Sequence, residues 1–262
     1  MRPLSHGFSP AAEAQPVVRH VGVERSTQWL ERGFADFRAH PVIGLSYGLV
    51  FAACGWLLTV GLAGLGMGSL ILPLAAGFML IAPLAAVGLY EVSRRRQEGT
   101  DRGLGLPAVL GAIRRNGQMA DMGFILLLLF FAWCQLAMVL FAAFYGGSAP
   151  ALGDFWGQVV MAPQGFAFLA TGTVVGGIVA AIAFTLSVVS MPMLLDRDVS
   201  VLTAMRTSVR AVWLNRLNMI GWAATLATLG ILGISLFFVG LAFTLPIAAH
   251  ASWHAYRDLV GN

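Results

Sequence analysis

The sequence contains no lysine and only two cysteines, and charged residues of either sign are rare. Charged residues make up 11% of the 262 positions, whereas soluble domains contain about 25%. Hydrophobic residues account for 58% of the chain, more than a water-exposed surface accommodates. These shortages exclude a soluble globular protein and predict an integral membrane protein.

The scarce residue types also narrow the chemistry. Cys54 and Cys134 both lie in apolar runs, where cysteine acts as a small packing residue, so we expect neither a disulfide nor a metal site. All 16 basic residues are arginines, which suggests a GC-rich bacterial genome. They lie beside hydrophobic runs and not on a soluble domain, so we expect no contact with nucleic acid.

The longest uncharged stretch is Pro41–Tyr90. A helix needs about 20 apolar residues to cross a bilayer, so these fifty residues predict two crossings joined by a turn. Glycines in Gly64–Ser69 mark the turn, and Pro73 falls in the first turns of the second helix, where proline is tolerated. The hairpin therefore lies between a basic entry at Arg38 and a basic exit at 94–96.

Three further uncharged runs follow, at residues 122–153, 155–195 and 217–256. The first two predict one crossing each, and the first of these ends near Tyr145. The third spans 40 residues and predicts two crossings, with a tight turn in the 230–240 region. The sequence therefore predicts six transmembrane helices.

A short amphipathic segment precedes each pair of crossings. In Ser26–Ala39 the apolar side chains share one helical face, and the opposite face carries Asp36 among its charged residues. The other two segments are 94–118, with a stripe formed by Leu106, Val109, Leu110 and Ile113, and 200–214. This pattern is typical of helices that lie in the membrane interface.

We therefore predict an all-α polytopic membrane protein with three hairpin repeats, each preceded by a cytoplasmic interfacial helix. The repeats cover about 26–96, 106–198 and 200–258, within a six-helix domain at 26–262 that follows a cytoplasmic tail at 1–25. The tail contains no apolar core of a signal peptide. A late proline in each repeat supports the symmetry: Pro83, Pro192 and Pro246.

The arginines predict the orientation. In this topology all 16 arginines lie on one side, and the opposite loops carry one charge, Asp154. The positive-inside rule then places both termini in the cytoplasm of a bacterium, with the chain in the inner membrane. No Asp, Glu or Arg lies in the middle of a crossing, which argues against a proton-driven pump.

His250 and His254 are four residues apart and share one face of the last helix. We interpret them as interfacial anchors that contact lipid headgroups, with a lipid phosphate, a protein partner or a metal as alternatives. The candidate interface or partner contacts cluster at the same cytoplasmic edge. They are His250, Trp253, His254, Tyr256, Arg257, Asp196, Arg197, Tyr90, Glu91 and Arg94.

Three segments carry a resemblance to a known family: Gly88–Gly99, Ser190–Asp198 and His250–Arg257. Together they resemble an uncharacterised family of proteobacterial integral membrane proteins, a domain of unknown function sometimes labelled putative cytochrome c oxidase subunit I. The resemblance implies no catalytic residues. An oxidase catalytic subunit needs about six membrane-embedded histidines, whereas this chain has five in total, so we expect no haem–copper catalysis.

Three functional hypotheses follow. We favour a non-catalytic scaffold or accessory or assembly subunit of a membrane complex, with a respiratory complex as the candidate that the family label suggests. Membrane lipids are the further contacts, and we expect no cofactor. A transporter or lipid-handling protein is the alternative. An enzyme comes third, because His250 and His254 could gather with Asp196 or Glu91 but no nucleophile motif accompanies them.

Overall fold

The computed structural model describes residues 16–112, 117–146 and 161–261, and within these ranges it contains helices and no strand. The only β-type pairing there is an isolated antiparallel bridge between Val18 and Val260. The predicted all-α class is therefore confirmed.

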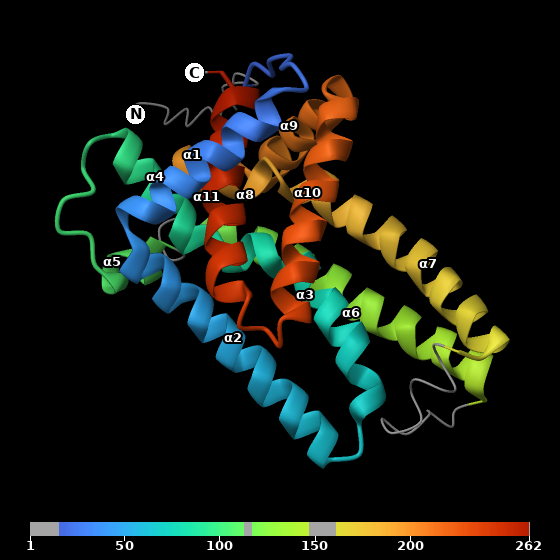
Figure 1. Ribbon diagram of the computed structural model, residues 1–262. Coiled ribbons are helices and arrows are strands. Elements are labelled where there is room, and N and C mark those ends of the chain that lie inside the picture. The colour runs from blue at the N-terminus through green and yellow to red at the C-terminus, as the bar shows by residue number, and fades with distance from the viewer. Residues whose placement is uncertain (1–15, 113–116, 147–160, 262) are drawn as a thin grey trace, which may run out of the picture.

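The described ranges contain eleven α-helices and one 3₁₀ turn (Figure 1). They are α1 (Arg25–Ala39), α2 (Pro41–Gly64), the 3₁₀ turn η1 (Gly68–Leu70), α3 (Ile71–Ala85), α4 (Val87–Gln97), α5 (Leu106–Gly111), α6 (Gly117–Tyr145), α7 (Pro163–Ser187), α8 (Ser190–Asp196), α9 (Val201–Leu214), α10 (Arg216–Ser235) and α11 (Leu241–Leu259).

Within the described ranges, five helical stretches are long and apolar enough to cross a membrane. They are Pro41–Gly64, Gly68–Gln97, Gly117–Tyr145, Pro163–Asp196 and Arg216–Ser235. The chain is thus a multi-pass membrane protein. The sixth expected crossing corresponds to α11, which is not among the five because its C-terminal half carries two histidines, Arg257 and Asp258.

The predicted turns are confirmed where the structure describes them. Gly66 adopts φ = 71° after α2, and Gly146 adopts φ = 61° after α6, a conformation that glycine reaches without steric cost. The turn between α10 and α11 covers residues 236–240, where Phe237 and Phe238 also have positive φ. Asp154, the one charge expected on this side, lies outside the described residues.

Two of the five stretches contain a break. Helix α7 ends at Ser187 and α8 begins at Ser190, and Pro192 cannot donate the hydrogen bond that the carbonyl of Val188 would accept in a continuous helix. Helix α3, with Pro83 inside it, ends at Ala85, and α4 continues to Gln97. The sequence predicts that the helix ends where the polar segment begins at Arg94, but α4 continues for one more turn, to Gln97.

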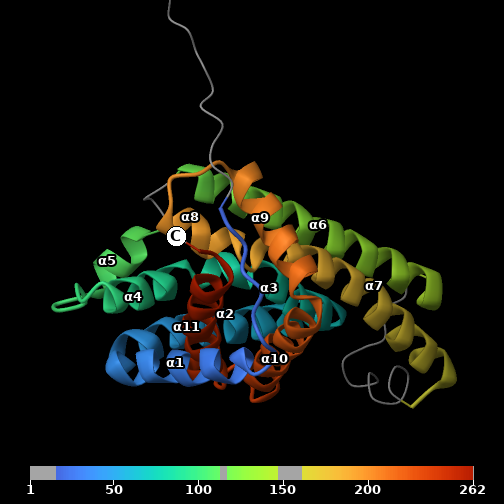
Figure 2. The ribbon, with the colours of Figure 1, turned by 90° about the horizontal axis from the view of Figure 1, so that it is seen from above.

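Helix α11 is the central element of the fold (Figure 1). It packs against α1, α2, α4 and α10, and α1 crosses it at an angle. Seen from above, α6 and α7 run side by side and extend away from α4 (Figure 2). Two glycines permit the closest approaches to α11: a Cβ on Gly33 would lie 2.5 Å from the backbone nitrogen of Ala251, and one on Gly48 would lie 2.6 Å from the Cα of Ala242.

The amphipathic segments at 26–39 and 200–214 are helices, as predicted. The face that each helix packs against the rest of the protein is not the large apolar face that the pattern indicates. Asp36, which was assigned to the polar face of α1, is buried, whereas Phe34 is 47% exposed. Helix α9 buries Ala204 and Ala211, while Trp213 is exposed. Small side chains let α9 approach the bundle closely, which leaves its large apolar side chains facing outward. Helix α5 is a single short turn of six residues.

The segment before α1 is not a free tail over the part that is described. The backbone N–H of Arg19 donates to the carbonyl of Leu259 at 2.8 Å, and the N–H of Val21 donates to the side chain of Asn215 at 2.8 Å. Residues 16–24 therefore lie between the start of α10 and the end of α11, a contact between distant parts of the chain that local patterns do not reveal.

The close packing of α2 on α11 generates a stability prediction. Gly48→Ala places a methyl group against backbone atoms of α11, so we expect the free energy of unfolding to fall by about 1–3 kcal/mol. Gly61→Ala is the matched control in the same helix, because its Cβ meets nothing within 4 Å. Thermal unfolding in detergent checks both, and an equal Tm for the two variants would contradict the packing.

Candidate functional site

Polar side chains gather where the last turns of α11 meet α1, α4 and α8. We call this group the polar cap and define it as Asp36, Glu91, Ser93, Gln97, Asp196, His250, Trp253, His254 and Tyr256 with the arginines that pair with them. Asp36, Glu91, Ser93, His250 and His254 are all buried. Since unpaired buried charges are costly, each carboxylate must find its partners inside the cap.

Asp36 lies at the centre of the cap. One of its oxygens, Oδ2, accepts from the hydroxyl of Ser93 at 2.6 Å and from Nε2 of His254 at 2.9 Å. The other oxygen forms an ion pair with Arg96. Helix α1 thereby supplies one carboxylate that is shared by α4 and α11.

The hydrogen-bond partners determine the imidazole tautomers. Gln97 donates its amide N–H to Nδ1 of His254 at 3.2 Å, so Nε2 of His254 carries the proton that Asp36 accepts. The single O–H of Ser93 donates to Asp36. Nδ1 of His250 must therefore be the donor in the 2.8 Å hydrogen bond between Ser93 and His250. The buried Nε2 of His250 has no hydrogen-bond partner within the described ranges.

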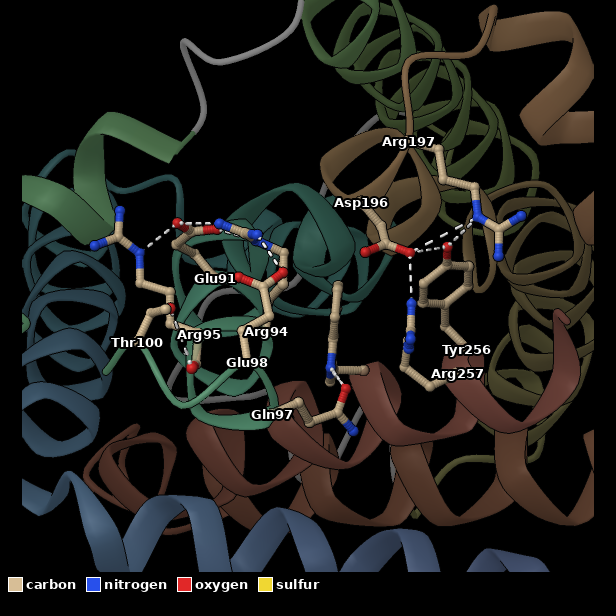
Figure 3. A network of polar contacts seen from close by, with 11 residues as sticks. Glu91, Arg94, Arg95, Gln97, Glu98, Thr100, Asp196, Arg197, Tyr256 and Arg257 are labelled. Atoms are coloured by element: carbon tan, nitrogen blue, oxygen red, sulfur yellow. Dashed lines mark hydrogen bonds and ion pairs between the residues drawn. The ribbon is translucent and has the colours of Figure 1, made fainter. Parts of the chain in front are cut away.

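Gln97 also connects the cap to an aromatic side chain. The indole N–H of Trp253 donates to the Gln97 carbonyl at 3.0 Å, a contact between α11 and the end of α4 (Figure 3). Trp253 in turn packs against Tyr256 with ring centroids 5.5 Å apart. The extra turn of α4 is what brings Gln97 within reach of α11.

Glu91 is the second buried carboxylate and is paired within α4 itself. Arg94 donates to it from Nε at 2.7 Å and from Nη2 at 2.9 Å, and Arg95 donates at 2.6 Å (Figure 3). Arg94 also bonds Glu98 at 2.6 Å. The bidentate geometry suits a guanidinium and a carboxylate, and the spacings i+3 and i+4 place both arginines over Glu91.

Asp196, at the end of α8, forms the third group (Figure 3). It accepts from the hydroxyl of Tyr256 at 2.6 Å and from Arg257 at 2.8 Å. Arg197 donates to the Tyr256 oxygen at 3.1 Å and to the carbonyl of Gly261 at 2.7 Å. This group therefore ties α8 to the C-terminal end of α11.

The partners of Asp36 hold it in the ionised form. Burial by itself raises the pKa of Asp36, but hydrogen bonds from His254 and Ser93, and the positive charge that His254 or His250 carries when protonated, lower it and outweigh burial. The pKa consequently lies below its ordinary value of 3.8. Without these partners, burial would favour the neutral, protonated form of Asp36.

The structure brings most of the predicted site residues together but changes their environment. Within the candidate set, the side chains of Tyr90, Glu91, His250, Trp253, His254 and Tyr256 are buried. The interpretation of His250 and His254 as headgroup anchors is therefore wrong, because α1 covers both imidazoles. Arg94, Arg197, Arg257 and Asp196 stay partly exposed at the rim, where contact with a partner is still a prediction.

Asp36, Ser93 and Gln97 were not singled out from the sequence. A carboxylate on an interfacial helix looks solvated, and its partners are 57 and 218 residues away in the chain. One signal was available: Asp36 lies three residues from Gly33, and a glycine in an amphipathic helix marks a face that approaches another backbone closely. Reading that face as buried would have pointed to Asp36.

The cap contains Ser, His and Asp side chains, but not in the arrangement of a catalytic triad. A triad needs an exposed serine that donates to a histidine whose other nitrogen is held by the aspartate. Here Ser93 donates to Asp36, is fully buried, and accepts a hydrogen bond from His250. The gathering of the histidines with Asp196 or Glu91, which the enzyme hypothesis required, is not seen, because His250 contacts Ser93 and His254 contacts Asp36. No group of three metal-ligating side chains exists within the described part of the chain.

Comparison with known proteins gives one match. Residues 71–196, from α3 to α8, match the family described as predicted integral membrane protein (DUF2189). This confirms the resemblance to a membrane family of unknown function; the match does not test its bacterial origin or the oxidase label. No curated protein and no solved structure matches the chain.

The central place of Asp36 predicts the effect of removing its charge. Asp36→Asn keeps the shape but takes the charged partner from Arg96 and His254, so we expect a loss of about 2–4 kcal/mol in the free energy of unfolding. Glu31→Gln, on the exposed side of α1, is the matched control and should change it by less than about 0.5 kcal/mol. A variant of Asp36 as stable as this control would contradict a buried, paired carboxylate.

The lowered pKa of Asp36 also predicts how the stability difference between wild type and Asp36→Asn depends on pH. A carboxylate with a lower pKa in the folded state stabilises the fold at every pH above its ordinary value of 3.8. That contribution is lost as the pH falls through the lowered folded-state pKa. We therefore expect the Tm difference between wild type and Asp36→Asn to be constant at neutral pH and to shrink below about pH 4.

Proposed function

We propose that this membrane protein is a non-catalytic scaffold or accessory subunit of a membrane complex, with a respiratory complex as the first candidate. The observation that supports this proposal is the closed polar cap. Asp36, Glu91 and Asp196 each form an ion pair with an arginine of the same chain. Side chains engaged in this way are unsuited to bind and transform a substrate.

The cap has the properties of a structural clamp. Its bonds join α1, α4, α8 and α11, which come from distant parts of the sequence, and a satisfied buried network favours one arrangement of helices. Replacing such a network by apolar residues is often neutral for stability, so its value lies in specificity. A helix bundle held in one arrangement is suited to present a fixed surface to a partner.

The proposed topology has six crossings, with α11 as the sixth and both termini in the cytoplasm of a bacterium. The polar cap, most arginines and the described ends of the chain lie at one end of the bundle, which supports this orientation. Helices α1 and α9 then serve as interfacial helices, and the exposed Trp213 fits the headgroup region. The broken helices α3–α4 and α7–α8 support the proposed repeat.

A second candidate, a lipid-handling or transport role, is favoured by one observation. An apolar groove opens between α3, α7, α10 and α11, within the membrane-spanning stretches. No charged side chain lines it, so the groove suits an uncharged molecule better than an ion.

The topology is tested with reporter fusions. Fusions after residues 66, 154 and 236 should report the periplasm, whereas those after 100, 205 and 262 should report the cytoplasm, because the arginine-rich segments stay inside. The pair at 236 and 262 isolates α11, since it brackets that helix alone. A periplasmic signal at both positions would remove the sixth crossing.

The scaffold proposal is tested by purification in mild detergent. We expect a second membrane protein to copurify with the tagged chain in a fixed ratio, and the ratio to persist through size-exclusion chromatography. A multi-pass protein of similar size with the same tag is the control for nonspecific capture. Recovery of the chain alone, folded and at its normal abundance, from native membranes would count against an accessory subunit.

A further inference from the structure

The groove between α3, α7, α10 and α11 has a volume of about 380 Å³, within the range of small-molecule sites. Small side chains make this space, because they leave the four helices apart where larger ones would fill it. Those that matter most are Ala82, Gly177, Ala181, Ala224, Ala227 and Ala248. The groove is separate from the polar cap, whose carboxylates and histidines do not line it.

Two hydroxyl groups at one end of the groove, those of Tyr90 and Ser187, have no hydrogen-bond partner within the described ranges. Tyr90 and Ser187 both line it, and their side chains are 4% and 1% exposed. Neither hydroxyl forms a hydrogen bond with any other residue in the described ranges. In contrast, Ser252 on the same wall bonds to the carbonyl of Ala248 at 2.8 Å, as hydroxyls in membrane helices usually do. Hydroxyl donors that line a groove and have no partner within the protein point to an acceptor supplied by a ligand.

The position of these hydroxyls indicates which end of the groove binds the polar part of a ligand. Tyr90 lies one turn before the arginines of α4, and Ser187 lies at the end of α7, next to α8. Both are therefore at the end of the groove that faces the polar cap. The remainder, towards Gly230 and Leu241, is apolar apart from Thr244, whose hydroxyl also has no partner in the described part of the chain.

The position of the groove within the membrane limits the kind of ligand that it can bind. The walls formed by α3, α7 and α10 belong to stretches that qualify as membrane spans, so the groove opens to hydrocarbon and not to water. Without a charged residue in its lining, it offers nothing to neutralise a phosphate or a free carboxylate. An apolar chain that ends in a neutral carbonyl oxygen meets both conditions.

We propose that the groove binds one acyl chain of a membrane phospholipid, whose ester carbonyl accepts hydrogen bonds from Tyr90 and Ser187. The lipid lies in the leaflet on the side of the polar cap, with its headgroup near the arginine-rich rim. The ester region of a phospholipid lies just below the headgroups, which is the depth of these two hydroxyls relative to the cap.

The experiment uses the full chain in detergent with dioleoyl phosphatidylethanolamine as the probe and counts bound lipid by native mass spectrometry. Gly177→Leu places a side chain in the groove, since a Cβ there meets nothing within 4 Å. Gly172→Leu is the matched control on α7, because its Cβ is also free of contacts but it does not line the groove. We expect one retained lipid in wild type and control, and none in Gly177→Leu.

Two further variants test the hydrogen bonds. Tyr90→Phe and Ser187→Ala should each weaken lipid retention by roughly two- to tenfold, the effect of one lost neutral hydrogen bond, without a change in Tm beyond that of the control. Equal retention in Gly177→Leu and wild type, or equal loss in both glycine variants, would overturn the proposal. So would a bound quinone in place of the phospholipid, recognised by near-ultraviolet absorption that disappears on reduction.

Discussion

The arrangement of the helices at the polar cap depends on one requirement, which is that the buried carboxylate of Asp36 stays ionised. A buried charge is costly unless hydrogen bonds and opposite charge surround it, and Asp36 draws these from Ser93, Arg96 and His254. Meeting that requirement positions α1 across α11 and places α4 beside both. The same requirement explains why α4 continues past the expected exit, because its last turn supplies Arg96 and Gln97.

The two ends of the bundle are held by different forces. At the cap end, directional hydrogen bonds and ion pairs specify which helices meet, and small residues such as Gly33 allow them to approach. Away from the cap, the helices present mostly exposed apolar faces that are suited to lipid, where burial in protein gives no advantage over burial in hydrocarbon. Packing there is consequently looser, and the groove between α3, α7, α10 and α11 lies in this part.

The cap and the groove meet along α4 and α11, which contribute side chains to both. Tyr90 lines the groove and its neighbour Glu91 belongs to the cap, while Ser252 and Trp253 show the same alternation on α11. Successive residues of a helix point about 100° apart, so one turn serves two surfaces. A lipid in the groove would thus lie against helices whose positions the cap holds in place.

Sequence patterns were sufficient to predict the membrane class, the helical content, the turns after α2 and α6, the region of the turn after α10, and the crowding of polar residues at one end. These follow from hydrophobic run length, glycine position and charge distribution, which are local properties. The folded arrangement was needed to establish that His250 and His254 are buried, that Asp36 is their neighbour and that Tyr90 and Ser187 face a groove. Those facts depend on contacts between residues up to 218 positions apart, where packing and desolvation, and not the local pattern, select which face of a helix is covered.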